Sequence, residues 1–319
     1  MMTDPIQPFL EDQGFLIIDG GLATELEFAG HYLRDSLWSA RLLAEAPDAI
    51  EKVHMDYLVA GADCIVSASY QASIPGFVER GATESEAENL IRKSVHLAVE
   101  ARDRFWDRVE NRVARRKPLV AAGVGPYGAY LANGAEFTGD YDLDEEGLVA
   151  FHRKRWHMLA ATGADLLACE TVPSFAESRA LASLLTETPD VQAWLSFSCR
   201  DGEHISDGTS IGRAVELLDP TPQVAAVGVN CTARSHILDL IGVLRSVTEK
   251  PVVVYPNSGE TYDAQRKCWT GIADPGDFAD AGLGWFDAGA RLLGGCCRTR
   301  PETIRRLRQT LTNRGSGQV

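Results

Sequence analysis

The chain has 319 residues, of which 45% are hydrophobic and 24% are charged, a composition typical of a soluble protein with a large buried core. Its net charge of −14 argues against binding to nucleic acid, whose phosphates need a basic face, and against binding to anionic membranes. Because no apolar run reaches the ~18 residues of a transmembrane helix and the first residues do not resemble a secretory signal, we expect a cytoplasmic protein. The sequence specifies no oligomeric state.

Short apolar runs rich in β-branched residues alternate with longer stretches of helical period along the chain. In residues 144–162, for example, Val149, His152, Trp156 and Leu159 recur on one helical face. This alternation predicts βα units around a parallel sheet. The eight strands that we expect are 15–19, 64–69, 119–124, 166–169, 193–198, 226–231, 252–255 and 291–294.

Eight strands in one chain suggest a closed (β/α)8 TIM barrel, although a doubly wound open sheet gives the same alternation. Polar residues at the ends of the expected strands favour the barrel, because those ends converge on one mouth. We find no linker that would divide the chain, so we expect a single domain over 1–319 with its core at about 15–311. Residues at or just beyond these strand ends include Asp19, Ser67, Glu170, Asn230, Cys231, Asn257, Cys296 and Cys297.

The adjacent cysteines Cys296 and Cys297 are the most specific chemical signal. Neighbouring residues fit the geometry of a disulfide poorly, because the Cα atoms and Cβ vectors must be suitably placed. Cys231 ends the sixth expected strand, and the pair follows the eighth, so only the seventh strand would separate them in a barrel. Three thiolates with an open fourth position are what a catalytic zinc ion would use.

The other four cysteines have no such partners in the pattern. A long chain with an odd number of cysteines, seven in all, favours reduced thiols or metal ligands over a disulfide framework. We interpret these four as structural: Cys64, Cys169, Cys199 and Cys268.

A GxGxxG pattern occurs at Gly123, Gly125 and Gly128, directly after an expected strand. In a dinucleotide-binding protein this pattern should open a helix whose N-terminus binds the pyrophosphate. Residues 126–141 contain further glycines and read as a long loop instead, so a nucleotide site is disfavoured. The carboxylates and aromatic residues of this loop could contact a cationic ligand.

Two carboxylates, Asp19 and Glu170, end the first and fourth expected strands. Asp19 could cap the following helix, and Glu170 could pair with an arginine. Placed together at a barrel mouth beside thiolates, they could instead recognise an ammonium group.

These motifs together resemble the homocysteine S-methyltransferases, zinc-dependent barrel enzymes that methylate homocysteine to methionine. The resemblance extends from residue 15 to about 311. It is closest to the branch that uses S-methylmethionine or S-adenosylmethionine. The matching segments are Asp19-Gly20-Gly21, Ser67-Ala68-Ser69-Tyr70-Gln71-Ala72, Glu170-Thr171, Gly228-Val229-Asn230-Cys231, Tyr255-Pro256-Asn257-Ser258-Gly259-Glu260 and Gly294-Gly295-Cys296-Cys297-Arg298-Thr299.

The resemblance implies that Cys231, Cys296 and Cys297 bind Zn2+ and that the homocysteine sulfur takes the fourth position. It implies a sulfonium methyl donor. Three alternatives remain at this point: another donor such as betaine, another acceptor such as selenocysteine, and a closed structural zinc site in a protein that is not an enzyme. The residues implied to bind the homocysteine substrate are Asp19, Gly20, Gly21, Glu170 and Asn230.

Overall fold

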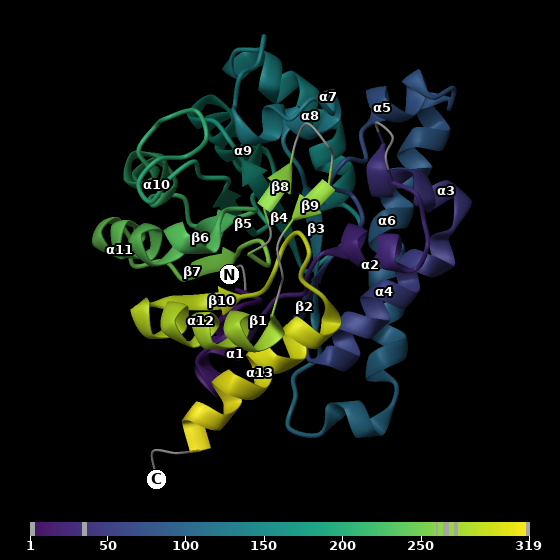
Figure 1. The fold of residues 1–319 in the computed structure, drawn as a ribbon. Coiled ribbons are helices and arrows are strands. Elements are labelled where there is room, and N and C mark those ends of the chain that lie inside the picture. Colours follow the sequence, from purple (N-terminus) through teal and green to yellow (C-terminus); the bar gives the residue numbers. More distant parts are fainter. Residues whose placement is uncertain (1–3, 34–36, 260, 264–267, 271–273, 317–319) are drawn as a thin grey trace.

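The computed structural model describes residues 4–33, 37–259, 261–263, 268–270 and 274–316. Eight parallel strands form one curved sheet that is surrounded by helices (Figure 1). All eight expected strands occur, so the predicted (β/α)8 barrel is confirmed. Its strands are β1 (Leu16–Ile17), β2 (Cys64–Val66), β3 (Leu119–Val124), β4 (Leu166–Val172), β5 (Ala193–Phe197), β6 (Val224–Asn230), β7 (Val252–Tyr255) and β10 (Ala290–Leu293).

The sheet is closed by contacts between its two edge strands. Its order is β1-β10-β7-β6-β5-β4-β3-β2, so β1 and β2 lie at the edges. A parallel bridge joins Ile18 to Cys64, and the amide of Asp19 donates a hydrogen bond to the Cys64 carbonyl at 3.0 Å. The doubly wound alternative is therefore excluded, because the edges of an open sheet do not meet.

Helices follow the strands where the sequence provides caps. Thr83 and Glu86 form a capping box at the start of the helix 84–106, and Asp274 caps the helix that begins at Pro275. The helices are α1 (Gln7–Gln13), α2 (Leu22–Phe28), α3 (Leu42–Glu45), α4 (Pro47–Ala60), α5 (Ile74–Glu79), α6 (Glu84–Trp106), α7 (Tyr127–Leu131), α8 (Glu145–Ala160), α9 (Phe175–Glu187), α10 (Ile211–Leu218), α11 (Ile237–Val247), α12 (Pro275–Ala288) and α13 (Pro301–Ser316). Shorter 3-10 turns are η1 (Trp38–Arg41), η2 (Val109–Arg112), η3 (Ala135–Phe137) and η4 (Arg234–His236).

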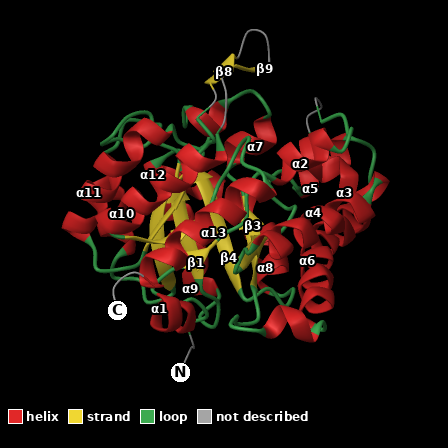
Figure 2. Ribbon diagram, turned by 60° about the horizontal axis from the view of Figure 1, so that its bottom comes forward, coloured by secondary structure: helices red, strands yellow, loops and turns green. Residues whose placement is uncertain are grey.

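Two apolar cores stabilise the barrel. The larger one lies between the sheet and the outer helices and includes the predicted inward face of α8, with Trp156 and Leu159 fully buried. The smaller one fills the barrel itself and includes Trp194 and Tyr255. Phe9 of α1 joins this inner core, and α1 lies at the end of the barrel opposite β8 and β9 (Figure 2). The strand ends near α1 are thereby covered, which leaves the opposite mouth for a site.

Two features differ from the sequence prediction. A two-stranded hairpin, β8 (Thr261–Asp263) and β9 (Cys268–Thr270), follows β7 and projects beyond the mouth (Figure 2). The segment 126–141, expected to be a loop, contains α7 and η3. Within the described ranges, no helix is both long enough and apolar enough to cross a membrane.

Candidate active site

Three cysteine sulfur atoms meet at the mouth of the barrel. The Sγ atoms of Cys231, Cys296 and Cys297 all lie within 4.8 Å of one another. Cys231 directly follows β6, the pair follows β10, and β7 lies between these two strands in the sheet. The structure therefore brings together the three residues that the sequence predicts as metal ligands.

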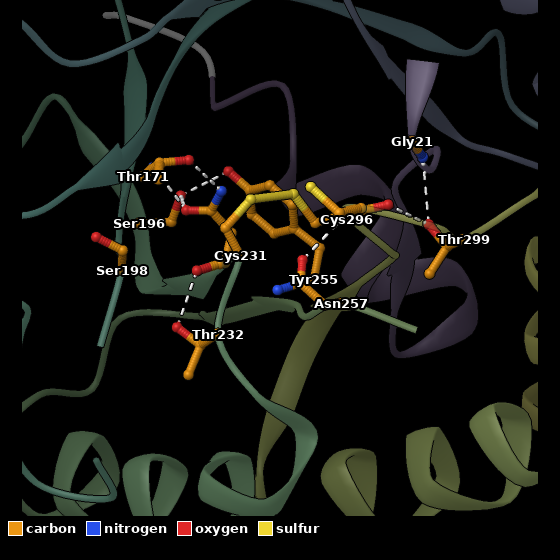
Figure 3. Close-up of a disulfide and its surroundings, with 12 residues drawn as sticks. Gly21, Thr171, Ser196, Ser198, Cys231, Thr232, Tyr255, Asn257, Cys296 and Thr299 are labelled. Carbon is orange, nitrogen blue, oxygen red and sulfur yellow. Dashed lines mark hydrogen bonds between the residues drawn. A yellow bond between two sulfur atoms is a disulfide. The ribbon is translucent and has the colours of Figure 1, made fainter. Parts of the chain in front are cut away.

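Cys231 and Cys296 are joined by a disulfide, with Cα atoms 5.6 Å apart, while Cys297 is free (Figure 3). The neighbouring pair is not bridged, as expected, but the sequence did not predict the bond between the two strand ends. A metal ion needs thiolates, so the three-sulfur site exists only in the reduced protein. In that state the donors are soft and suit zinc, with room in its tetrahedral geometry for one further ligand.

The segment after β7 holds the cysteine pair in place. The amide of Cys296 donates to the Pro256 carbonyl at 2.9 Å, and the amide of Cys297 donates to Oδ1 of Asn257 at 3.2 Å. A Cβ atom at Gly295 would lie 2.3 Å from Thr299 Oγ1, so only glycine allows the chain to turn this tightly before the pair. The position of the thiols thus depends on backbone contacts between two neighbouring strand ends.

Asp19 and Glu170 lie at the same mouth. Asp19 is 4% exposed, and its Oδ2 accepts a hydrogen bond from the Val66 amide at 2.9 Å. Burial raises the pKa of Asp19 well above its usual range, and the charge of Glu170 adds to this effect. Burial raises the pKa of Glu170 to about 8, partly opposed by a hydrogen bond with Tyr255. An ammonium group bound beside these two carboxyl groups would favour their ionised forms and lower both pKa values.

The simpler roles considered for these carboxylates are not seen. The N-cap of α2 is Gly21, with no hydrogen bond from a capping side chain, and Asp19 bonds across the barrel to Val66 instead. Glu170 forms no ion pair with an arginine among the residues that the structure describes. Both carboxyl groups therefore remain available to a ligand.

Gly20 and Gly21 allow close packing beside the cysteine pair. A Cβ atom at Gly20 would lie 2.8 Å from Thr299 Oγ1 and 2.9 Å from the Tyr57 hydroxyl. The amide of Gly21 donates to Thr299 Oγ1 at 3.2 Å (Figure 3). Direct binding of substrate by these two glycines stays a prediction.

Asn230, at the end of β6, is fully buried and engaged by protein groups. Its Oδ1 accepts hydrogen bonds from the Thr171 amide at 2.7 Å and from Ser196 Oγ at 2.9 Å, and its Nδ2 donates to Thr171 Oγ1 at 2.8 Å. Ser196 also lies in hydrogen-bond contact with the Tyr255 hydroxyl (Figure 3). These hydrogen bonds satisfy the buried side chain of Asn230 without any contact to a substrate. The role of Asn230 in substrate binding stays a prediction.

The GxGxxG segment is explained by packing at the mouth. A Cβ atom at Gly125 would lie 2.3 Å from the Tyr70 carbonyl oxygen, and one at Gly128 would lie 2.3 Å from the Glu136 nitrogen. A Cβ atom at Gly123 would lie 3.2 Å from Glu170 Oε1. Each glycine makes room for another part of the site, so no nucleotide is needed to account for them.

The sequence analysis did not single out Tyr70 or Glu136 as site residues. Burial raises the pKa of Tyr70, and the charges of Glu136 and Glu170 contribute. Burial likewise raises the pKa of Cys297 to about 12, with Glu136 the largest contributing charge. Their positions come from packing, because the Tyr70 carbonyl lies against Gly125 and the Glu136 nitrogen lies against Gly128, both just after β3. The only sequence signal for Glu136 was its position in a carboxylate-bearing segment after β3.

The remaining cysteines stand apart from the sulfur cluster. Cys64 and Cys169 are buried and free, and Cys199 is free and partly buried. These positions agree with the structural role expected for them. The side chain of Cys268 and the whole of Glu260, which belongs to one of the matching segments, lie outside the described residues.

Known proteins resemble this chain over nearly its full length. The homocysteine S-methyltransferase YbgG of Bacillus subtilis is 50% identical over 95% of this chain and 96% of its own length. The selenocysteine Se-methyltransferase of Brassica oleracea is 46% identical over 96% of this chain and 91% of its own length.

Solved structures agree with this similarity. The oxidized form of the homocysteine methyltransferase MmuM from Escherichia coli is 48% identical to this chain and superposes with a TM-score of 0.88, over 96% of this chain and 99% of that one. Its metallated form gives a TM-score of 0.86, over 95% and 98%.

The fold and the site define a (β/α)8 barrel methyltransferase with three convergent cysteines at its mouth. Residues 16–311 match the family described as homocysteine S-methyltransferase. The chain belongs to this family.

Proposed function

We propose that this protein transfers a methyl group from a sulfonium donor, S-methylmethionine or S-adenosylmethionine, to the thiol of homocysteine and so forms methionine. The observation that carries the proposal is the convergence of three cysteine sulfurs within 4.8 Å at the barrel mouth of a chain of this family. Asp19, which is buried, and Glu170, which is half-buried, lie at the same mouth and suit the ammonium group of homocysteine.

Zinc is the metal that we propose for Cys231, Cys296 and Cys297 once they are reduced. When bound, it would act as a Lewis acid that keeps the substrate thiol deprotonated near pH 7. Among the described residues, no further histidine, cysteine or carboxylate completes the group of three. This favours an open site over a closed structural one.

The transfer balances without an oxidant or a reductant. The homocysteine sulfur forms a bond to the methyl carbon while the bond from that carbon to the donor sulfur breaks. The electron pair of the broken bond returns to the donor sulfur, which becomes a neutral thioether, and the proton of the thiol is released. Because thiolate and sulfonium neutralise each other, a mouth lined by buried residues such as Asn230 and Thr171 strengthens their attraction.

Selenocysteine is the second candidate acceptor. The observation that favours it is the 46% identity to a selenocysteine Se-methyltransferase. A selenol would enter the same position as the homocysteine thiol, with the same balance of bonds.

The test is product formation by the reduced, zinc-loaded protein. Homocysteine is offered with S-methylmethionine, S-adenosylmethionine, betaine or methyltetrahydrofolate, and methionine is quantified. We expect turnover with a sulfonium donor and only background with betaine and the folate. Selenocysteine then replaces homocysteine with the best donor. Turnover with betaine alone would refute the donor assignment.

Zinc X-ray absorption spectra distinguish an open site from a structural one. Homocysteine should add a sulfur ligand to the zinc of an open site. A spectrum that shows four protein ligands and does not change with homocysteine would contradict the proposal.

A further inference from the structure

Glu136 is a third carboxylate at the mouth that the proposed function leaves without a role. It lies in η3, on the segment between β3 and α8, whereas Asp19 and Glu170 lie at the ends of β1 and β4. No lysine or arginine within the described part of the chain forms an ion pair with Glu136. The mouth therefore holds one carboxyl group more than the two that we propose for the ammonium group of homocysteine.

The backbone around Glu136 is fixed by close contacts. Its carbonyl accepts a hydrogen bond from Ser198 Oγ at 2.9 Å, at the end of β5. Gly128 of α7 packs so closely that an added Cβ atom would lie 2.3 Å from the Glu136 nitrogen. These contacts fix the backbone of the turn that carries the Glu136 side chain.

One oxygen of the Glu136 carboxylate is buried without a hydrogen-bond partner. This atom is Oε2, and no described group donates to it. An unsatisfied buried acceptor is unfavourable, so a ligand that donates a hydrogen bond there gains affinity. The Ser198 hydroxyl that binds the Glu136 carbonyl directly follows β5, so the turn that carries Glu136 lies at the mouth of the barrel.

The chemistry of the donor indicates which of its groups fits this oxygen. A sulfonium has no hydrogen to donate, and it must lie in line with the homocysteine sulfur at the cysteine cluster. S-methylmethionine and S-adenosylmethionine also carry an α-ammonium group, which has three donors. We propose that Glu136 binds the α-ammonium group of the methyl donor, an inference that rests on the proposed function.

This assignment gives the enzyme a means of choosing its donor. An amino-acid donor would satisfy Oε2 of Glu136, whereas betaine and methyltetrahydrofolate have no α-ammonium group to do so. Sites that hydrogen-bond a substrate group reject analogues that lack this group, because the buried partner is then left unpaired.

The experiment compares two donors that differ only in the ammonium group. They are S-methylmethionine and (3-carboxypropyl)dimethylsulfonium, and each is used with homocysteine and the reduced, zinc-loaded protein. For E136Q, we expect kcat/KM with S-methylmethionine to fall about 10- to 100-fold, the range for loss of a charged hydrogen bond. With the deaminated donor, the variant and the wild type should agree within about twofold, because neither can bind an absent group.

Two variants serve as controls. Glu27 is exposed and its charge also acts on Cys297, so E27Q removes the same charge without removing a buried acceptor. E27Q should leave kcat/KM unchanged with both donors. E136D retains the charge and should recover part of the loss with S-methylmethionine. Zinc content and thermal unfolding are measured for each variant to detect structural damage.

Three outcomes would overturn the inference. Equal losses with both donors would show a structural or general electrostatic role for Glu136. If E136Q raised the KM of homocysteine and not the KM of the donor, Glu136 would bind the acceptor. If E136Q had the same kinetic constants as the wild type, Glu136 would have no role in binding. If E136Q does not fold, the same comparison of the two donors with E136D tests whether Glu136 binds the ammonium group. Failure of the wild type with every sulfonium donor would instead refute the proposed function.

Discussion

The side-chain amide of Asn230 holds Thr171 at two points, since it accepts from the Thr171 amide at 2.7 Å and donates to Thr171 Oγ1 at 2.8 Å. Thr171 has a φ of 59°, a left-handed conformation that is strained for a β-branched residue. Cys231, directly after Asn230, is also left-handed, with a φ of 48°. A single amide therefore joins the strand end that carries Glu170 to the one that carries a cysteine of the cluster.

Asn230→Ala is expected to destabilise the protein and impair the site. The change leaves the buried amide of Thr171 without a partner, which should lower the free energy of unfolding by about 2–3 kcal/mol. The KM of homocysteine should rise because Glu170 is no longer held. Urea denaturation and steady-state kinetics measure the two effects. Ser196→Ala removes one hydrogen bond to Asn230 and the contact with the Tyr255 hydroxyl but leaves both hydrogen bonds to Thr171, so it should cost less, about 1–2 kcal/mol. Wild-type stability and KM in Asn230→Ala would contradict the positioning role.

The strands were largely predictable because most are buried on both faces. Leu119–Val124 and Val252–Tyr255 occur with the predicted bounds, since both are continuous apolar runs between polar or turn-forming residues. β4 extends to Val172, beyond the predicted end at Cys169. The polar residues Glu170 and Thr171 concealed that extension, and both lie at the mouth of the barrel.

The sequence predicted those site residues that have a distinctive chemistry and stand at the end of a strand. Cys231, Cys296 and Cys297 were found in this way, and the structure brings them together. Glu136 was not, because its role depends on packing between a short helix and a 3-10 turn that the sequence did not reveal. The disulfide between Cys231 and Cys296 also depends on neighbours in space, not in sequence.

Cys296→Ser should abolish both zinc binding and methyl transfer. The hydroxyl of serine is a harder and far less acidic ligand than a thiol, so two thiolates remain where three are required. Zinc per chain is measured by elemental analysis after reduction, and methionine formation is measured in parallel. Cys199→Ser is the matched control, since Cys199 is free and outside the cluster, and it should retain both properties. Full activity in zinc-free Cys296→Ser would exclude the proposed role of the metal.

Glu170→Gln should raise the KM of homocysteine about 10- to 100-fold, the cost of a lost charged hydrogen bond, and leave zinc content unchanged. Because burial raises the pKa of Glu170 to about 8, more of the wild-type carboxyl becomes charged as the pH rises through this value. Its affinity for an ammonium group increases in the same range. The ratio of the KM of the variant to that of the wild type should therefore increase between pH 7 and 9.

This ratio removes the contribution of the substrate thiol, whose ionisation affects both proteins equally. A ratio that does not change with pH would argue that Glu170 does not bind the ammonium group. Loss of stoichiometric zinc in Glu170→Gln would show that the residue supports the metal site instead.

His54 of α4 should make the protein less stable at acidic pH. Its ring is fully buried, and neither nitrogen has a hydrogen-bond partner among the described residues. Burial lowers the pKa of His54 from 6.5 to about 4, so the folded state resists protonation more than the unfolded state does. The stability that this provides is complete above pH 6.5 and is lost as the pH falls towards 4, by about 3 kcal/mol in all.

His54→Leu should raise the free energy of unfolding by about 1 kcal/mol at pH 7, because a buried polar group without partners is replaced by an apolar one. The variant should also lose less stability than the wild type between pH 7 and 5. Urea denaturation at several pH values measures both effects. His96→Ala, at an exposed position of α6, controls for the loss of a histidine and should follow the wild-type dependence on pH. Parallel pH profiles for the wild type and His54→Leu would show that His54 does not limit stability in acid.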